Sequence, residues 1–440
     1  MRASKSKREA ADYFFIDFLE YFIKLLLLYK LIKGKLMINF EHAADQFGTP
    51  LYIYDMEAIK NNCQRILEGV GSYFKNFKVY YSVKANSNPV LIKRILDMGF
   101  GCDTSNVNEV RLAKLSGCSY DNMIFTGNFV TVDHLMSLNP EIKINFDDID
   151  VYSMFSKRKY RSEVSFRVNL GYGKGFSKKV QTGGKEAKFG IMKDKIFKAY
   201  ETAAKAGAKS FGIMNMGGSL VLSPSYYRDV FLEVLTLTKS IESKLKIPFK
   251  YIDMGGGYGI SYKKPNISLD FKKLGKAFLE ACQTAKVDPD SFTLILEPGR
   301  IVVGNTGYLV TKVLSIKNSF RNFIGVDANM SSLVRPAMYG ARHRIVPLYE
   351  FKKYKRFIVC GQACENSDVF GKYNLPADIK PGDLLLICDA GAYGYAMSSN
   401  YNSFDKPCEV LFDNDKYLFI RPRENTIEDY FINMKKFGFL

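Results

Sequence analysis

A lysine and a glutamate each follow a short apolar run, where a buried charge would need a partner. Lys84 comes after Tyr80-Tyr81-Ser82-Val83, and Glu297 comes after Leu294-Ile295-Leu296. Burying an ammonium or a carboxylate is costly unless it is paired. A lysine amine with a lowered pKa can form a Schiff base with a carbonyl group. The simpler alternatives are a lysine that reaches solvent and a glutamate that pairs with Arg300.

A glycine-rich loop supplies a third part of the same chemistry. The segment Asp253-Met254-Gly255-Gly256-Gly257-Tyr258-Gly259 follows another apolar run. Its backbone N–H groups could approach an anion closely, although alone it could be only a turn. A carboxylate paired to a pyridinium is common in enzymes of pyridoxal 5'-phosphate (PLP). Lys84 for the aldehyde, the glycines for the phosphate and Glu297 for the ring nitrogen together describe that one cofactor.

A second group of reactive side chains lies in the last third of the chain. Cys364-Glu365 places a thiol beside a carboxylate in polar surroundings, although a buried structural cysteine is the alternative. Arg335 offers a guanidinium fork that suits a carboxylate, and Tyr339 offers a phenol. Tyr393 stands in a segment of small residues, 389–402, which is typical of close backbone approach.

Eight short apolar runs alternate with helical patterns between residues 55 and 300. Stretches between the runs, such as Asn106–Leu115 and Tyr227–Leu245, have helical periodicity. Eight such units predict a closed (β/α)8 barrel, with its chemistry at the carboxyl ends of the strands. Lys84, the glycine loop and Glu297 follow the first, seventh and eighth runs. The runs are Lys78–Val83, Gly101–Thr104, Met123–Thr126, Ile142–Phe146, Val164–Val168, Phe211–Asn215, Tyr251–Met254 and Thr293–Leu296.

The pattern predicts four regions in all. The barrel covers residues 55–300, and residues 301–440 predict a mostly antiparallel β domain. Residues 37–54 contain a lead-in strand, Leu51–Tyr54, which we expect to join the β domain. Residues 1–36 form an extension that we expect to be non-essential. Four charges interrupt its apolar stretch 13–32, which argues against a membrane span and leaves an amphipathic helix on a membrane or a partner as the alternative.

Composition excludes several classes of protein. The chain has 440 residues, 47% of them hydrophobic, which is ordinary for a globular protein. Its net charge of +18 is spread along the sequence without an arginine-rich stripe, so we expect no nucleic-acid partner. Eight cysteines without a CxxC pair, and only three histidines, argue against a zinc site and a disulfide framework. We therefore expect no metal, and reduced thiols in a cytoplasmic protein.

Over residues 38–435 the chain resembles the diaminopimelate decarboxylases, which are fold-type III PLP enzymes with an alanine-racemase-like barrel and a C-terminal β domain. Ornithine-type relatives usually carry Cys-Asp where this chain has Cys364-Glu365. The motifs that carry the resemblance are Tyr81-Ser-Val-Lys84-Ala-Asn, Thr182-Gly-Gly with Lys188-Phe-Gly, Glu297-Pro-Gly-Arg300, Cys364-Glu365-Asn-Ser-Asp and Asp389-Ala-Gly-Ala-Tyr393.

The resemblance implies decarboxylation of meso-2,6-diaminopimelate to L-lysine and carbon dioxide, the last step of lysine biosynthesis. It implies that Lys84 holds PLP covalently and that Cys364 protonates the carbon from which carbon dioxide leaves. It also implies a homodimer, because in this family that cysteine and the following glutamate come from the partner subunit. The cofactor-binding residues that it implies are Lys84, Ser219, Gly255, Gly256, Gly257, Glu297, Gly299, Arg300 and Tyr393. The substrate-binding residues that it implies are Arg300, Arg335, Tyr339, Glu365 and Tyr393.

One stretch departs from the family pattern. Relatives commonly have His-x-His-x-Gly-Ser after the sixth strand, and the second histidine stacks on the cofactor ring. This chain has Met214-Asn-Met216-Gly-Gly-Ser219, and a thioether can still pack against an aromatic face. Two alternatives stay open. A decarboxylase of another diamino acid or polyamine precursor is opposed by Glu365 and the paired arginines, and a non-catalytic regulatory homologue is opposed by Lys84 and Cys364.

Overall fold

The computed structural model describes residues 38–175, 181–264 and 267–438, so the predicted N-terminal extension and its apolar stretch lie outside the described residues. The chain divides into two compact units. We call residues 54–307 and 389–397 the barrel unit, and residues 38–53, 308–388 and 398–438 the β unit. In the described part of the chain, no helix is both long and apolar enough to cross a membrane.

Eight parallel strands close into a barrel, as the sequence predicts. Every neighbouring pair is parallel, β12 pairs with β2, and β5 pairs with β6, which completes the ring. The predicted runs agree with the observed strands to within two residues at each end. The strands are β2 (Phe77–Ser82), β3 (Gly101–Thr104), β4 (Met123–Phe125), β5 (Lys143–Phe146), β6 (Glu163–Asn169), β9 (Ser210–Met214), β11 (Phe249–Asp253) and β12 (Thr293–Leu296).

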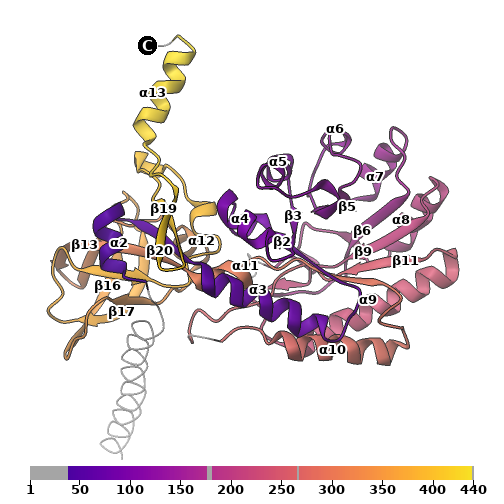
Figure 1. Ribbon diagram of the computed structural model, residues 1–440, viewed down its shortest axis with the longest axis horizontal. Coiled ribbons are helices and arrows are strands. Elements are labelled where there is room, and N and C mark those ends of the chain that lie inside the picture. Colours follow the sequence, from indigo (N-terminus) through magenta and orange to yellow (C-terminus); the bar gives the residue numbers. More distant parts are fainter. Residues whose placement is uncertain (1–37, 176–180, 265–266, 439–440) are drawn as a thin grey trace, which may run out of the picture. The chain divides into compact units, whose positions relative to one another are not determined.

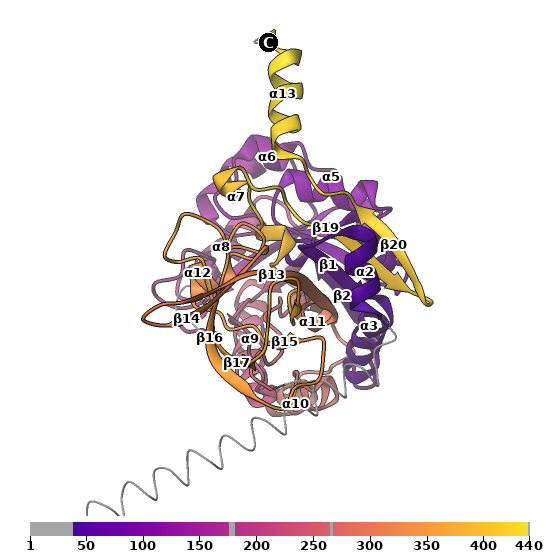
Figure 2. The ribbon, with the colours of Figure 1, turned by 90° about the vertical axis from the view of Figure 1, so that its left-hand side faces the viewer.

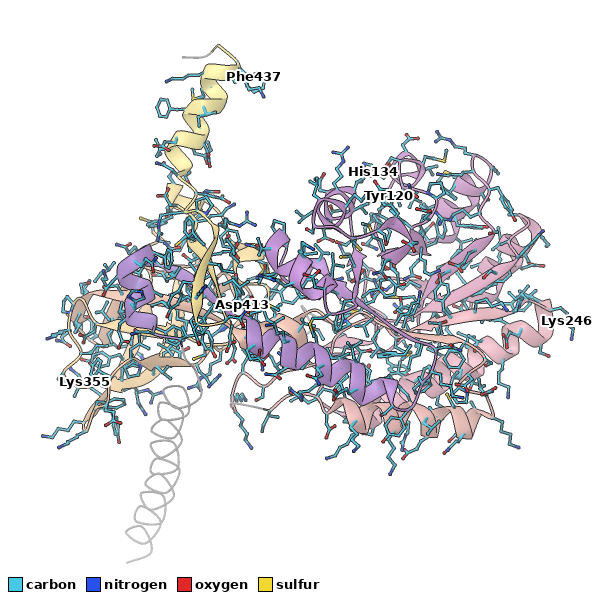
Figure 3. The ribbon with its side chains drawn as sticks, viewed as in Figure 1. Tyr120, His134, Lys246, Lys355, Asp413 and Phe437 are labelled. Carbon is cyan, nitrogen blue, oxygen red and sulfur yellow. The ribbon has the colours of Figure 1, made fainter. Side chains whose placement is uncertain are left out.

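Amphipathic helices cover the barrel strands because their apolar residues recur with the helical period. Figure 1 shows α3, α9 and α10 running along one side of the barrel. Phe231 of α9 packs edge-on against Phe278 of α10, with ring centroids 4.8 Å apart. Two of the barrel unit's surface side chains, His134 on α6 and Lys246 at the end of α9, are labelled in Figure 3. The helices are α3 (Met56–Gly71), α4 (Pro89–Leu96), α5 (Val107–Leu115), α6 (Val132–Met136), α7 (Ile149–Ser156), α8 (Ile196–Lys205), α9 (Pro224–Leu245), α10 (Phe271–Ala285) and α11 (Arg300–Val303).

Short elements at the strand ends shape the site. The 3-10 turn η1 (Val83–Ala85) follows β2 and carries Lys84. Directly after it, Asn88 caps α4 by accepting the N–H of Val90, and Pro89 occupies the first turn, where its missing N–H costs nothing. The remaining short strands of this unit are β7 (Lys174–Gly175), β8 (Ile191–Met192) and β10 (Gly218–Ser219).

The β unit is built on a second sheet, whose strands are labelled in Figure 2. Its strand order is β17-β16-β14-β13-β1-β19-β20, and β18 pairs with β13 and β15. Most of these pairings are antiparallel, and β14 with β16 is parallel. The strands are β1 (Leu51–Asp55), β13 (Gly307–Asn318), β14 (Asn322–Val326), β15 (Ile345–Pro347), β16 (Tyr354–Cys360), β17 (Val369–Pro376), β18 (Leu384–Ile387), β19 (Cys408–Asp413) and β20 (Lys416–Arg421).

Three α-helices accompany this sheet. α2 (Phe40–Phe47) packs its apolar face into the core of the β unit, α12 (Arg335–Tyr339) is a single turn, and α13 (Thr426–Lys436) follows the last strand. Figures 1 and 2 show α13 extending away from the strands of its unit. Apolar side chains on and after α13 are exposed, among them Ile432 and Phe437, the latter labelled in Figure 3.

Candidate active site

Lys84 lies against a buried carboxylate. Its Nζ is 2.5 Å from Oδ2 of Asp103, which stands near the end of β3, and 3.4 Å from Oγ of Ser82. Oγ of Ser82 is in turn 2.7 Å from the same Asp103 oxygen. Asp103 is 1% exposed, whereas the Lys84 side chain keeps 37% of its surface exposed. Asp103 therefore has its counter-charge in a lysine side chain that stays partly exposed.

The predicted lowering of the Lys84 pKa is wrong. Burial does lower the pKa of Lys84, but the negative charges of Asp103 and Glu297 outweigh burial and raise that pKa above the ordinary value. The sequence could not show this, because Asp103 reaches Lys84 from a different strand. The amine is thus the counter-ion of Asp103 as well as the candidate nucleophile, and it must lose a proton before it can attack a carbonyl carbon.

Asp253 and Glu297 bring two more carboxyl groups to the same end of the barrel. Oδ1 of Asp253 accepts the N–H of Gly255 at 2.8 Å, and Oδ2 accepts from Nδ2 of Asn145 at 3.2 Å. Burial raises the pKa of Asp253 to about 7. Burial, together with the charges of Asp103 and Asp253, raises the pKa of Glu297 well above its usual range.

Glu297 has a carboxyl oxygen that the described residues leave unpartnered. The side chain is 2% exposed, and its Oε1 has no hydrogen-bond partner in the described part of the chain. Leaving a buried polar atom unpaired costs about 1–3 kcal/mol. A protonated ring nitrogen is the kind of group that would meet this oxygen.

Arg300, the alternative partner of Glu297, contacts two tyrosines. Its Nη1 donates a hydrogen bond to the Tyr262 hydroxyl at 2.8 Å, and its Cζ lies 4.6 Å from the centre of the Tyr393 ring. The N–H of Tyr393 donates to the carbonyl of Ala85 at 2.7 Å, which ties segment 389–397 to the residue after Lys84. Arg300 and Tyr393, predicted from separate motifs, are therefore neighbours beside the lysine turn.

The glycine loop packs so closely against neighbouring backbone that side chains would not fit. Gly257 has a φ of +91°, and a Cβ there would lie 2.3 Å from the Gly218 carbonyl oxygen, in the segment that also holds Ser219. A Cβ on Gly256 would lie 2.5 Å from the carbonyl oxygen of Glu297. The loop after β11, strand β10 and the Glu297 turn are thus packed together into what we call the cradle, and the N–H groups of a glycine loop of this kind can bind a phosphate.

The remaining predicted positions border this cradle. The carbonyl of Pro298, next to Gly299, accepts the N–H of Ser82 at 3.1 Å, so this turn crosses the end of β2. Met216 lies against the glycine loop, because the Gly256 N–H points at its Sδ from 3.3 Å. Met214 is buried.

These residues fit PLP. They combine a partly exposed lysine, a buried carboxyl oxygen that lacks a partner in the described part of the chain and a closely packed glycine loop, all at the carboxyl ends of strands of one barrel. Sequence reasoning missed Asp103 and Ser82. The signal that could have found Asp103 is a charged residue in a short predicted strand, Gly101–Thr104, and a charge at the end of such a strand is what identified Glu297.

Cys364 and Glu365 belong to the β unit, in the loop between β16 and β17. The Cys364 thiol is exposed, and its backbone N–H donates to Oδ1 of Asn402 at 2.9 Å. The Tyr401 hydroxyl donates to Oε1 of Glu365 at 2.8 Å.

Arg335 is buried in the β unit, at the start of α12. It is 1% exposed, and its Nη1 lies 2.8 Å from Nε2 of His343. Because arginine can only donate, Nε2 must accept, and Nδ1 of His343 carries the hydrogen that it donates to the Cys388 carbonyl at 3.0 Å. Tyr339, at the end of α12, is half-buried. Substrate contacts of Arg335 and Tyr339 stay predictions.

Known proteins resemble this chain in sequence and in fold. The family description "pyridoxal-dependent decarboxylase, pyridoxal binding domain" matches residues 56–304. The diaminopimelate decarboxylase of Methanothermobacter thermautotrophicus is 34% identical over 403 residues, which cover 89% of this chain and 94% of the relative. That of Archaeoglobus fulgidus is 35% identical over 387 residues, covering 86% and 91%. The chain belongs to the diaminopimelate decarboxylase family.

A solved structure in this family agrees with the fold. The diaminopimelate decarboxylase of Helicobacter pylori, complexed with L-lysine, matches with a TM-score of 0.82 at 27% identity, covering 90% of this chain and all of that one. The protein is an enzyme of the PLP-dependent decarboxylase family, and its cofactor is PLP. The lysine, glycine loop and glutamate described above are the parts of the barrel unit that fit this cofactor.

Proposed function

We propose that this chain removes carbon dioxide from meso-2,6-diaminopimelate and releases L-lysine, the last step of lysine biosynthesis. The observation that carries the proposal is that a partly exposed Lys84 and a buried Glu297 oxygen without a partner in the described residues lie at the same end of the barrel. Membership of the diaminopimelate decarboxylase family supports this choice of substrate.

PLP, when bound, supplies a protonated ring that accepts the electron pair of the breaking bond between the α carbon and the carboxylate. Lys84 would hold the cofactor, and the carboxylate of Asp103 beside it neutralises the positive charge of the Lys84 amine. Glu297 would pair with the ring nitrogen, and because burial raises the pKa of its carboxyl group, a proton could be shared between the two. Ser219 and the N–H groups of residues 255–257 bind the phosphate.

The substrate loses its α-carboxylate as carbon dioxide, and one proton takes its place. We assign delivery of that proton to the Cys364 thiol, the exposed nucleophile of the β unit. Glu365 binds the distal ammonium group of the substrate by opposite charge. Arg300 and Arg335 bind the distal carboxylate, a match for the planar fork of a guanidinium, and Tyr339 and Tyr393 complete the substrate site.

We further propose a homodimer in which Cys364 and Glu365 of the partner subunit serve each barrel. The resemblance to the family supports this, and exposed apolar side chains on α13 are of a kind often covered by a partner. All eight cysteines are free, which supports a reducing compartment, the cytoplasm.

The test is release of carbon dioxide by the purified, PLP-loaded protein. We expect release from meso-diaminopimelate, with L-lysine formed in equal amount, and none from ornithine, lysine or carboxynorspermidine. The Lys84→Ala protein serves as the control and should release none. Release mainly from one of the other substrates would contradict the proposed substrate. No release at all by protein that demonstrably holds PLP would contradict the proposed activity.

A further inference from the structure

In the β unit, two consecutive residues of one turn contact Cys364 and Glu365, the two residues of this unit to which we assign roles in the reaction. The turn is η6 (Tyr401–Ser403). Oδ1 of Asn402 accepts the backbone N–H of Cys364 at 2.9 Å, and the Tyr401 hydroxyl donates to Oε1 of Glu365 at 2.8 Å. All four residues lie in the β unit. The two contacts differ in kind, because one holds a backbone and the other holds a carboxylate.

The turn has an unusual backbone that is fixed from behind. Asn402 has φ 56° and ψ 24°, in the left-handed region that asparagine enters more readily than most residues. Ser331 anchors the N-terminal side of the turn. Its Oγ donates to the Tyr401 carbonyl at 3.1 Å, and its own carbonyl accepts the N–H of Ser399 at 3.0 Å. The Asn402 amide is therefore aimed at Cys364 by a fixed backbone.

The loop that carries Cys364 is held at its base by a buried carboxylate. Asp368 is 3% exposed, its Oδ2 accepts the N–H of Ala363 at 2.8 Å, and its Oδ1 accepts the N–H of Met330 at 2.7 Å. The base is therefore rigid without η6, whereas Cys364 and Glu365 at the tip are exposed. Contacts at the tip then decide where the thiol and the carboxylate point.

We propose that Tyr401 and Asn402 are positioning residues of the decarboxylase. Asn402 fixes the backbone from which Cys364 presents its thiol to the α carbon, and Tyr401 fixes the Glu365 carboxylate that binds the substrate's distal ammonium group. The proposal rests on the proposed function, which assigns those roles to Cys364 and Glu365. Hydrogen bonds to charged groups correspond to a factor of roughly 10 to 100 in an equilibrium, so losing the Tyr401 contact should be measurable.

The first test reads the thiol itself, without turnover. In the single chain Cys364 is exposed, Cys360 is half-buried and the other six cysteines are buried. A thiol that meets the substrate must also be open to a small reagent, so alkylation of the holoenzyme by iodoacetamide should begin at Cys364. Asn402→Gly removes the amide and keeps the backbone conformation, because glycine accepts a positive φ. We expect this variant to change the Cys364 alkylation rate several-fold, with the site of alkylation checked by peptide mass. An unchanged rate would overturn the role of Asn402.

Asn414→Gly is the matched control. Asn414 also has a positive φ, 50°, and sits at the tip of the β19–β20 hairpin, next to Asp413 (Figure 3). The same substitution there should leave the alkylation rate of Cys364 unchanged. An equal change in both variants would contradict a specific role for Asn402.

The second test separates binding from turnover. Asn402→Gly should lower kcat roughly tenfold with little change in KM, and Tyr401→Phe should raise KM roughly tenfold with a smaller effect on kcat. If the two residues had only a structural role, their loss would lower the amount of folded protein and leave kcat and KM of the protein that still folds unchanged. The control is Tyr160→Phe, at an exposed tyrosine of the barrel unit. If Asn402→Gly and Tyr401→Phe both have the kcat and KM of this control, the proposal is wrong.

Two further variants distinguish failure of this inference from failure of the proposed function. If Cys364→Ala and Glu365→Gln keep wild-type constants, the proposed roles of those residues fail, and the positioning roles fail with them. If those two variants lose activity while Tyr401→Phe and Asn402→Gly do not, only the positioning inference fails.

Discussion

At the scale of single residues, the chemistry of the barrel end depends on which charges meet there. Lys84 and Glu297 could be identified from the sequence because each follows an apolar run, where an unpaired charge is costly. The charge state of Lys84 could not be identified, because Asp103 and Glu297 approach it from other strands and raise its pKa. Sequence order places these groups about 20 and 200 residues apart, and only the closed barrel brings them together.

The role of Glu297 predicts the effect of replacing it by glutamine. Glu297→Gln keeps the length and shape of the side chain, but the amide can neither carry a negative charge nor exchange a proton with the ring nitrogen. Because a hydrogen bond to a charged group stabilises by about 1.5–3 kcal/mol, we expect kcat for meso-diaminopimelate to fall at least about tenfold. PLP should stay attached through Lys84, which the visible absorbance of the protein would show.

Glu41→Gln, at an exposed position on α2, is the control for this change and should behave as wild type. A Glu297→Gln protein with undiminished kcat would show that this carboxylate does not act on the ring nitrogen.

At the scale of elements, the barrel strands were predictable and the segments that connect them to the site were not. A parallel strand buried on both faces reads as a continuous apolar run, and each of the eight was recognised. Segment 389–397 gave no such signal. It belongs to the barrel unit because the N–H groups of Ala390, Gly391 and Tyr393 donate to the backbone carbonyls of residues 307, 304 and 85, respectively. Those partners are far away in sequence, so local patterning cannot reveal them.

The glycine loop supplies the prediction at this scale. Gly257→Ala would place a Cβ 2.3 Å from the Gly218 carbonyl oxygen, so the loop or β10 must move. Overpacking of this kind costs about 1–3 kcal/mol, and we expect the dissociation constant for PLP, followed by absorbance titration, to rise about tenfold or more.

Gly382→Ala tests the backbone effect alone. Gly382 has nearly the same φ, +95°, but a Cβ there would meet no atom within 4 Å. That variant should bind PLP as wild type does. Equal PLP affinity in both variants would mean that the glycine loop is not the phosphate cradle.

At the scale of the whole molecule, each unit carries part of the chemistry that we propose. Lys84, Glu297 and the glycine loop lie in the barrel unit, and Cys364, Glu365 and their supporting turn lie in the β unit. The sequence indicated both groups, yet neither its pattern nor its motifs indicated Tyr401 and Asn402 as supports of Cys364 and Glu365. Their contacts depend on two loops about 36 residues apart meeting in the fold.

The measurement that tests the account most directly is recovery of activity on mixing Lys84→Ala protein with Cys364→Ala protein. Each variant alone should release almost no carbon dioxide from meso-diaminopimelate. If subunits exchange at random in a symmetric dimer, each mixed dimer regains one intact site, and equal amounts should recover about a quarter of wild-type activity. No recovery, although native mass spectrometry shows mixed dimers, would contradict the claim that Lys84 of one subunit works with Cys364 of its partner.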